Sequence, residues 1–184
     1  MSDLHVVILA AGKGTRMKSA RPKVLHNVAG TPMIDHVMAA AQSLQPRSIT
    51  LVVGHMKELL RQGLERYSGL SYVTQEPQLG TGHALLQTAG VLEREKGMVL
   101  LLSGDVPLLK GRTLAALVNK HIESKAAATV LTAMVEQPYG YGRIVRIKGR
   151  ISRIVEERDA SPTQRKIREI NSGVYVFSLG PLFE

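Results

Sequence analysis

The sequence of 184 residues contains no cysteine and no tryptophan. The absence of cysteine excludes disulfide bonds, thiolate metal sites and cysteine nucleophiles, and it favours a reducing compartment. No apolar stretch approaches the roughly 20 residues that a membrane-spanning helix needs. The first residues also lack the basic and apolar regions of a secretion signal. These absences predict a cytoplasmic protein that does not associate with membranes.

Aromatic residues are scarce, at 4% of the chain, whereas the formal net charge is +9. Such a charge favours anionic partners, which include nucleotides, sugar phosphates and nucleic acid. Nucleic acid is the weakest of these, because the chain has few aromatic residues to stack on bases and no recognised basic–aromatic module. The sequence therefore predicts small anionic ligands and no nucleic-acid partner. Its length suits one domain or slightly more.

The most informative stretch follows the first apolar run. Residues 6–9 are apolar and mostly β-branched, which predicts a short strand buried on both faces. The small residues Ala10, Ala11 and Gly12 come next and let a ligand approach the backbone. Five cations follow within eleven residues, namely Lys13, Arg16, Lys18, Arg21 and Lys23. This combination predicts a polyphosphate site.

The stretch fits neither of two common phosphate motifs. Met17 replaces the third glycine of the dinucleotide fingerprint, and no P-loop sequence occurs. By its charges alone, it is also compatible with a solvated surface turn.

Apolar runs and helical spacings alternate along the first two thirds of the chain. Strands are expected at 48–53, 71–74, 98–103 and 128–135, and helices from 32 onward, over 59–69, 83–92 and 113–125. This alternation predicts an α/β fold of Rossmann-like type, with a mixed, mainly parallel sheet and helices on both faces. Ligands of such sheets bind beyond the carboxyl ends of the strands. The loops after residues 9, 74 and 103 are therefore expected to converge.

The pattern changes from Pro138 onward. Short strands are expected here without intervening helices, and residues 143–168 contain nine Lys or Arg against three acidic residues. We expect a nucleotide-binding α/β core over 1–137 and a small β-rich, sugar-binding part over 138–184. The sequence stops without a C-terminal helix pattern, which predicts a domain that is incomplete at its C-terminus.

Three polar positions in the first part are candidates for chemistry. Asp105 follows an apolar strand and Gly104, so its carboxylate could hold Mg²⁺ between phosphate oxygens; a helix N-cap or a loop aspartate is the alternative. Gln75 offers a donor and an acceptor to a base edge, and Gly80 lets a flat ring pass close to the backbone. Thr81 either binds a phosphate or sugar oxygen or caps the following helix.

The second part offers Gly142, Glu156 and Asn171 for a sugar, whose hydroxyl and amide groups need carboxylate and amide partners. By its residues alone, the pair Glu156 and Glu157 is also typical of a solvated surface. His83 at a helix start is more typical of a structural role. No Ser/His/Asp triad and no zinc set are present.

Residues 9–17, Leu-Ala-Ala-Gly-Lys-Gly-Thr-Arg-Met, followed by Pro22-Lys23, resemble the signature of the sugar-nucleotide pyrophosphorylases. Further motifs extend the resemblance over nearly the whole chain, to the uridyltransferase domain of the bacterial bifunctional N-acetylglucosamine-1-phosphate uridyltransferase / glucosamine-1-phosphate acetyltransferases. These motifs lie at 75–84, 104–107, 139–144, 154–156 with 159–160, and 169–173.

The resemblance implies a reaction of UTP with N-acetylglucosamine 1-phosphate, with Mg²⁺, that gives UDP-N-acetylglucosamine and pyrophosphate. It implies uridine contacts for Leu9, Ala10, Ala11, Gly12, Gln75 and Gly80. It implies that Arg16 and Lys23 bind the triphosphate and take part in catalysis. Sugar-side contacts fall to Thr81, Gly142, Glu156 and Asn171, metal binding to Asp105, and further substrate contacts to Ser103 and Gly104. The family often has an aromatic residue where Ser103 stands, so this contact departs from the pattern.

The resemblance also implies parts that these residues do not include. One is a later segment of the same domain with a metal-side asparagine, and the other is an acetyltransferase domain that uses acetyl-CoA and forms a homotrimer. Two other functions stay open. The chain could serve another sugar phosphate, such as that of glucose or a pentose alcohol, or it could bind nucleotide sugars without catalysis.

Overall fold

The computed structural model of the chain describes residues 3–12, 14, 17–54 and 56–184. It consists of two compact units. The first comprises 1–129 and 175–184, and the second comprises 130–174, compared with the expected parts 1–137 and 138–184. In the described part of the chain, no helix has the length and apolar character that crossing a membrane requires.

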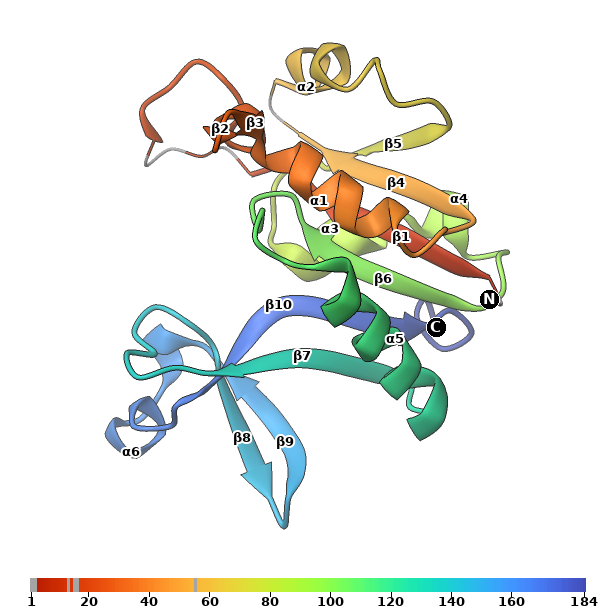
Figure 1. Cartoon of the computed structure of the whole chain (residues 1–184). Helices are drawn as coiled ribbons and strands as arrows, with labels where there is room; N and C mark the ends of the chain where they lie inside the picture. Colours follow the sequence, from red (N-terminus) through yellow and green to blue (C-terminus); the bar gives the residue numbers. More distant parts are fainter. Residues whose placement is uncertain (1–2, 13, 15–16, 55) are drawn as a thin grey trace. The chain divides into compact units, whose positions relative to one another are not determined.

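The first unit is built on a sheet of largely apolar strands (Figure 1). In spatial order these are β5 (Leu70–Thr74), β4 (Ser48–Val53), β1 (Leu4–Leu9), β6 (Met98–Ser103) and the last part of β10 (Glu169–Ser178). The first four are parallel to one another, and β10 pairs with β6 in the antiparallel sense. The mixed α/β fold with a mainly parallel sheet is therefore confirmed.

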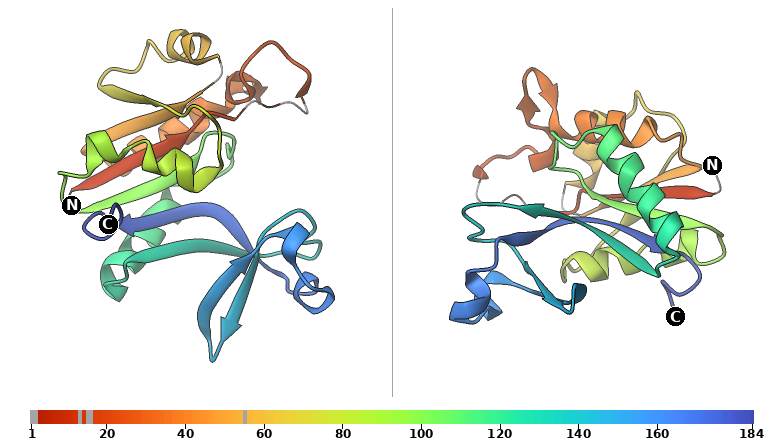
Figure 2. Two further views of the ribbon diagram at one scale, coloured as in Figure 1. Left: turned by 180° about the vertical axis from the view of Figure 1, so that it is seen from behind. Right: turned by 60° about the horizontal axis from the view of Figure 1, so that its bottom comes forward.

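Helices cover both faces of this sheet. On one face lie α1 (Met33–Gln42) and α5 (Gly111–Ser124), which contact each other. On the other face lie α3 (Thr81–Leu86) and α4 (Ala89–Leu92), which come forward in the view from behind (Figure 2). Because both faces are covered, the strands can be apolar along their whole length. Val7, Val52, Leu92, Val99 and Leu101 belong to the resulting core.

Three shorter elements complete the first unit's N-terminal half. The 3-10 helix η2 (Lys23–Leu25) leads into a two-stranded antiparallel ribbon of β2 (Asn27–Val28) and β3 (Thr31–Pro32). Helix α2 (Lys57–Gly63) follows β4. The expected helix over 59–69 is wrong at its end, because α2 ends at Gly63. The Leu25 side chain packs against Gly63 and leaves no room for a Cβ there.

The expected single helix over 83–92 is also wrong. It is divided between α3 and α4 at Thr88, which is fully buried. The Thr88 hydroxyl donates to the Leu85 carbonyl oxygen at 2.6 Å, and the Thr88 N–H donates to the same oxygen at 2.9 Å. A threonine that bonds to its local backbone in this way competes with the regular helical pattern.

The second unit is mostly antiparallel. Its strands are β8 (Arg143–Ile147), β9 (Arg150–Val155), most of β7 (Ala128–Met134) and the first part of β10. Strand β7 pairs with β10 and does not extend the parallel series, contrary to expectation. The expected absence of helices is also wrong. The 3-10 helix η3 (Glu157–Asp159) and the one-turn α6 (Pro162–Arg165) follow β9, and a Ser161–Gln164 capping box begins α6.

Candidate active site

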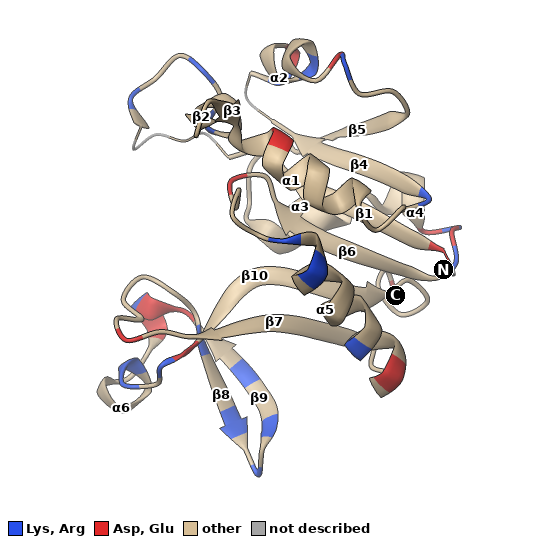
Figure 3. Ribbon diagram, in the orientation of Figure 1, with Lys and Arg blue, Asp and Glu red and all other residues tan. Residues whose placement is uncertain are grey.

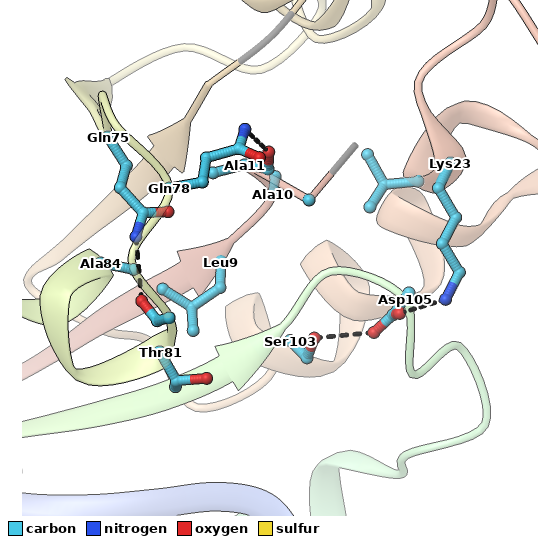
Figure 4. Close-up of a pocket in the computed structure, with 13 residues that line it drawn as sticks. Leu9, Ala10, Ala11, Lys23, Gln75, Gln78, Thr81, Ala84, Ser103 and Asp105 are labelled. Carbon is cyan, nitrogen blue, oxygen red and sulfur yellow. Dashed lines mark hydrogen bonds and ion pairs between the residues drawn. The ribbon is translucent and has the colours of Figure 1, made fainter. Parts of the chain in front are cut away.

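The loops that follow β1, β5 and β6 meet around a cavity of about 350 Å³ in the first unit (Figure 4). This is the convergence expected for the carboxyl edge of a parallel sheet. The cavity is lined by Leu9, Ala10, Ala11, Gly12, Lys23, Val24, Gln75, Gln78, Gly80, Thr81, Ala84, Ser103 and Asp105.

Backbone hydrogen bonds between neighbouring strands hold the three loops at this edge. The Ala10 N–H donates to the Val52 carbonyl at 2.8 Å, and the Gln75 N–H donates to the Val53 carbonyl at 2.8 Å. The Gly104 N–H donates to the Leu9 carbonyl at 2.9 Å. Each loop therefore begins from a rigid strand end, so the side chains that line the cavity start from fixed positions.

Lys23 and Asp105 form an ion pair at the cavity wall. Their Nζ and Oδ2 atoms are 2.5 Å apart, and both side chains are about one third exposed. Lys23 begins η2 after Pro22 and packs against Gly14, which has φ +58°. A Cβ at Gly14 would lie 3.0 Å from the Lys23 Cβ, so glycine serves both the backbone conformation and the close approach.

Asp105 carries its negative charge at neutral pH. Burial raises the pKa of its carboxyl, but hydrogen bonds from Lys23 and Ser103 and the charge of Lys23 outweigh burial and hold the pKa below its usual range. The Ser103 hydroxyl donates to Oδ1 at 2.7 Å. Asp105 is not a helix N-cap, because α5 begins at Gly111 after Lys110. The N-cap alternative is therefore wrong, whereas Asp105 does lie in the turn that follows β6.

Asp105 is also the side chain that could bind a metal ion in this cavity. Among the residues that the structure describes, no group of three or more His, Asp or Glu could enclose a metal ion. Mg²⁺ often binds through one or two carboxylates and completes its coordination with water and substrate phosphates. An ionised Asp105 next to the Ser103 hydroxyl fits a metal ion that binds together with a nucleotide.

Gln75 is buried in the wall of the cavity, and its amide is held in one orientation. Its Nε2 atom donates to the Gly80 carbonyl at 2.9 Å and lies 3.2 Å from the His83 Nδ1 atom. The other ring nitrogen of His83 lies 3.2 Å from the Gln87 Nε2 atom. His83 thus has a structural role behind Gln75, while the side-chain oxygen of Gln75 points away from Gly80 (Figure 4).

Gln78 lines the same cavity and was not expected from the sequence. Its Nε2 atom donates to the Ala11 carbonyl, and so connects the loop after β5 to the loop after β1. Gly54 makes room for this contact, because a Cβ there would lie 2.6 Å from Gln78 Nε2 and 3.0 Å from the Ala11 oxygen. The sequence feature that could have identified Gln78 is that it is a second glutamine, three residues after Gln75.

The remaining candidates of the first part differ in whether they line the cavity. Thr81 lines the cavity but does not cap α3, whose N-cap is Gly80, so the capping alternative is wrong. Gly104 is buried just outside the lining, where a Cβ would crowd Ile34, the Leu9 oxygen and Val24 at 3.1 Å each. Arg16 lies outside the described residues.

Within the second unit, Gly142, Glu156 and Asn171 come together. The Asn171 N–H donates to the Gly142 carbonyl at 2.8 Å, and a Cβ at Gly142 would lie 3.0 Å from a Glu156 carboxylate oxygen. Glu156 is exposed, whereas Glu157 is not part of a solvated pair. It forms an ion pair at 2.6 Å with the buried Arg143, a residue that the sequence did not single out because it lies in a stretch rich in cations.

A parallel sheet whose carboxyl edge gathers a glycine loop, a lysine and an ionised aspartate is typical of α/β proteins that bind a nucleoside triphosphate, and the nucleotidyltransferases are one class of these. Residues 6–169 match the model of the MobA-like NTP transferase domain, and the chain belongs to this family. Such nucleotidyltransferases generally use a divalent metal ion, in agreement with the position of Asp105.

Curated relatives are similar in sequence to this chain over nearly its whole length. The bifunctional protein GlmU of Streptococcus suis is 45% identical over 185 residues, which cover 100% of this chain and 40% of that protein. The bifunctional protein GlmU of Brevibacillus brevis is 51% identical over 178 residues, covering 96% of this chain and 38% of that protein. The chain therefore spans about two fifths of the length of these relatives. The resemblance identified from the motifs is confirmed.

Solved structures support the fold at lower identity. A putative glucose-1-phosphate thymidylyltransferase from Bacillus anthracis superposes with a TM-score of 0.76 at 22% identity, over 97% of this chain and 73% of that one. A UDP-glucose pyrophosphorylase complexed with UDP-glucose also has a TM-score of 0.76, at 18% identity, over 96% of this chain and 76% of that one.

Proposed function

We propose that this chain transfers a uridylyl group from UTP to N-acetylglucosamine 1-phosphate, producing UDP-N-acetylglucosamine and pyrophosphate. The observation that carries the proposal is the Lys23–Asp105 pair in a cavity formed by the loops after β1, β5 and β6. The similarity to proteins named bifunctional protein GlmU supports the choice of substrates.

The first unit supplies groups for the nucleotide. The residues Leu9, Ala10, Ala11 and Gly12 offer backbone groups to the uridine with little side-chain bulk. Gln75 has its amide nitrogen hydrogen-bonded to the Gly80 carbonyl, so its side-chain oxygen suits a donor such as the ring N–H of uracil. The loop after β5 thereby favours a base that presents a donor at this position.

The Lys23–Asp105 pair would separate on nucleotide binding, so that Lys23 would face the triphosphate and Asp105 would be free to hold a metal ion. Lys23 can then place its charge on the phosphate oxygens, where negative charge accumulates during the reaction. Asp105, with the Ser103 hydroxyl beside it, would hold Mg²⁺, which supplies positive charge to the phosphate oxygens when bound. Arg16, which the sequence assigns to the triphosphate, belongs to the same proposal.

The reaction needs no protein nucleophile. An oxygen of the sugar phosphate, already negatively charged, forms a bond to the α-phosphorus of UTP while the bond to the bridging oxygen of pyrophosphate breaks. The protein contributes alignment and charge neutralisation. We assign Gly142, Glu156 and Asn171, which come together within the second unit, to the sugar part of the acceptor. Thr81, which lines the cavity of the first unit, is a separate candidate for a phosphate or sugar oxygen.

The test is pyrophosphate release from UTP with Mg²⁺, compared between N-acetylglucosamine 1-phosphate and glucose 1-phosphate, with the sugar nucleotide identified by chromatography. We expect release that depends on the metal ion and on the acetylated sugar. A preference for glucose 1-phosphate would assign the chain to another sugar phosphate. Nucleotide-sugar binding without any pyrophosphate release would contradict catalysis. Competition by an oligonucleotide at the level of UTP would contradict the small-molecule assignment.

A further inference from the structure

Arg143 is the largest fully buried side chain among the described residues, and it is 1% exposed. Burying a guanidinium is costly unless it is paired, and a well-packed apolar residue often serves stability as well or better. The buried charge at the start of β8 is therefore weak evidence for a contribution to stability, and its contacts indicate what else it does. Its Nε atom has no hydrogen-bond partner, so the cost of burial is only partly offset.

The side-chain hydrogen bonds of Arg143 connect one turn of the chain to Glu157. One terminal nitrogen lies 2.6 Å from the Oε2 atom of Glu157, and the other donates to the Tyr141 carbonyl. The same Oε2 atom accepts the N–H of Gly140 at 3.1 Å, in a turn where Gly140 has φ +84°. A single carboxylate oxygen of Glu157 thus accepts hydrogen bonds from Gly140 within the turn 139–142 and from Arg143, which directly follows the turn. Arg165 lies farther off, at 3.6 Å from the other oxygen.

The two segments joined by this pair carry two proposed sugar-binding residues. Gly142 directly precedes Arg143, and Glu156 directly precedes Glu157. The Glu156 carboxylate closes over Gly142, where an added Cβ would come within 3.0 Å of it. A shift of the turn relative to Glu156 would alter this spacing. Asn171 is joined to Gly142 by a backbone hydrogen bond of 2.8 Å that does not involve the side chains of the pair.

We infer that Arg143 and Glu157 are positioning residues, which hold Gly142 and Glu156 at the spacing that the sugar part of the acceptor requires. This inference rests on the proposed function. The pair itself need not touch a substrate, because Arg143 is enclosed by protein. Its effect should therefore appear in the binding of the sugar phosphate and not in the binding of the nucleotide.

The test separates positioning from folding by removing the two charges together. Arg143→Met alone leaves a carboxylate without its main partner and is expected to destabilise the second unit. Arg143→Met/Glu157→Gln removes both charges and keeps similar volumes, so thermal unfolding should stay close to that of the unaltered chain. In this double variant we expect the KM for N-acetylglucosamine 1-phosphate to rise about tenfold, with the KM for UTP within about twofold.

Two further variants complete the experiment. Glu157→Gln keeps an acceptor for Gly140 and Arg143 but leaves the buried Arg143 charge uncompensated, so it should lower the thermal stability while it raises the sugar-phosphate KM less than the double variant does. Arg146→Met/Glu169→Gln removes a more exposed pair of the same unit, with side chains 42% and 16% exposed and hydrogen bonds of 2.8 and 2.7 Å. It should leave both KM values unchanged.

The outcomes distinguish this inference from the proposed function. If the unaltered chain turns over the substrates but the folded double variant keeps the sugar-phosphate KM, the pair is only structural and the inference is wrong. An equal rise in both KM values would also contradict it. If the unaltered chain releases no pyrophosphate with any sugar phosphate, the proposed function fails, and this inference fails with it.

Discussion

The two units bury different kinds of side chain. In the first unit, β1, β4, β5 and β6 contain no Lys, Arg, Asp or Glu, and their ribbons are free of charge colours in Figure 3. In the second unit, β8 and β9 carry four arginines between them. Only a few apolar residues are buried there, and a buried ion pair lies among them.

This difference separates two ways of placing a functional group. In the first unit an apolar core fixes strand ends, and the polar side chains of the cavity extend from those ends. In the second unit a small core leaves much of the positioning to hydrogen bonds and ion pairs. We therefore expect core substitutions to lower the stability of the first unit, and substitutions of paired groups to alter the geometry of the second.

The largest effect is expected from a cavity in the apolar core. Leu101→Ala in β6 removes a side chain that is 2% exposed and should lower the free energy of unfolding by about 2–5 kcal/mol. The contrasting change, at an exposed position of the second unit, is Ile151→Thr on β9, where the residue is 42% exposed and the effect should stay within about 0.5 kcal/mol. Urea unfolding measures both. Similar losses would show that the two units do not differ in this way.

The next effect concerns the cavity and not the core. Lys23→Ala should remove about 2–4 kcal/mol of transition-state stabilisation, or roughly 30- to 900-fold in kcat/KM, because it removes a positive charge that the proposal places on the phosphates. Circular dichroism should show an intact fold, since Lys23 is one third exposed. Lys120→Ala on the exposed side of α5 makes the same charge change and should leave the kinetics unaltered. Unchanged kinetics in Lys23→Ala would remove this residue from the reaction.

The sequence predicts the first unit better than the second, and the reason is physical. A parallel strand covered on both faces must be apolar throughout, so β1, β4 and β6 are visible as runs. Their order along the chain then places Gly12, Lys23, Gln75 and Asp105 at one edge, and the structure does bring these four residues into one cavity. The binding roles of these residues remain predictions.

The sequence does not predict contacts that depend on pairing across long distances. Gln78 meets Ala11 from 67 positions away, and only the folded sheet shows that Gly54 leaves room for the contact. Arg143 looks like one cation among many until its burial beside Glu157 is known. The break at Thr88 depends on one hydroxyl that bonds backward within its own turn. Side-chain patterns alone describe none of these.

A smaller effect should follow from closing the space beside Gln78. Gly54→Ala places a Cβ against Gln78 and Ala11, so it should displace the Gln78 amide and cost about 1–3 kcal/mol of stability. We also expect a several-fold rise in the KM for UTP. Gly54→Ala/Gln78→Ala should recover part of the stability, which a double-mutant cycle measures.

The glycine control for this experiment is Gly90→Ala in α4. A Cβ at Gly90 would meet no atom within 4 Å, so this change should be neutral or slightly stabilising. Additive losses in the Gly54/Gln78 cycle would mean that Gly54 does not act through Gln78.

The smallest effect concerns one of the buried polar side chains of the mainly apolar first unit. His121 of α5 is 3% exposed, and its ring nitrogens lie 2.9 Å from the Thr129 hydroxyl and 3.1 Å from the Ser178 hydroxyl. Burial lowers the pKa of its imidazole below the usual 6.5, so the folded chain binds its proton less readily than the unfolded chain does. The stability that depends on neutral His121 is thus present above about pH 6.5 and decreases as the pH falls through the lowered pKa.

His121→Gln keeps polar groups in this position but cannot titrate. The decrease in the urea midpoint from about pH 7.5 to about pH 5 should therefore be smaller in the variant than in the unaltered chain, with the other histidines as a common background. The effect should be smaller than that of Leu101→Ala, because only one hydrogen-bonded group changes. An equal decrease in both proteins would show that protonation of His121 does not lower the stability of the folded chain. Burial of a titratable group would then be tolerated in the first unit as it is in the second, and the contrast between the units would be limited to their apolar cores.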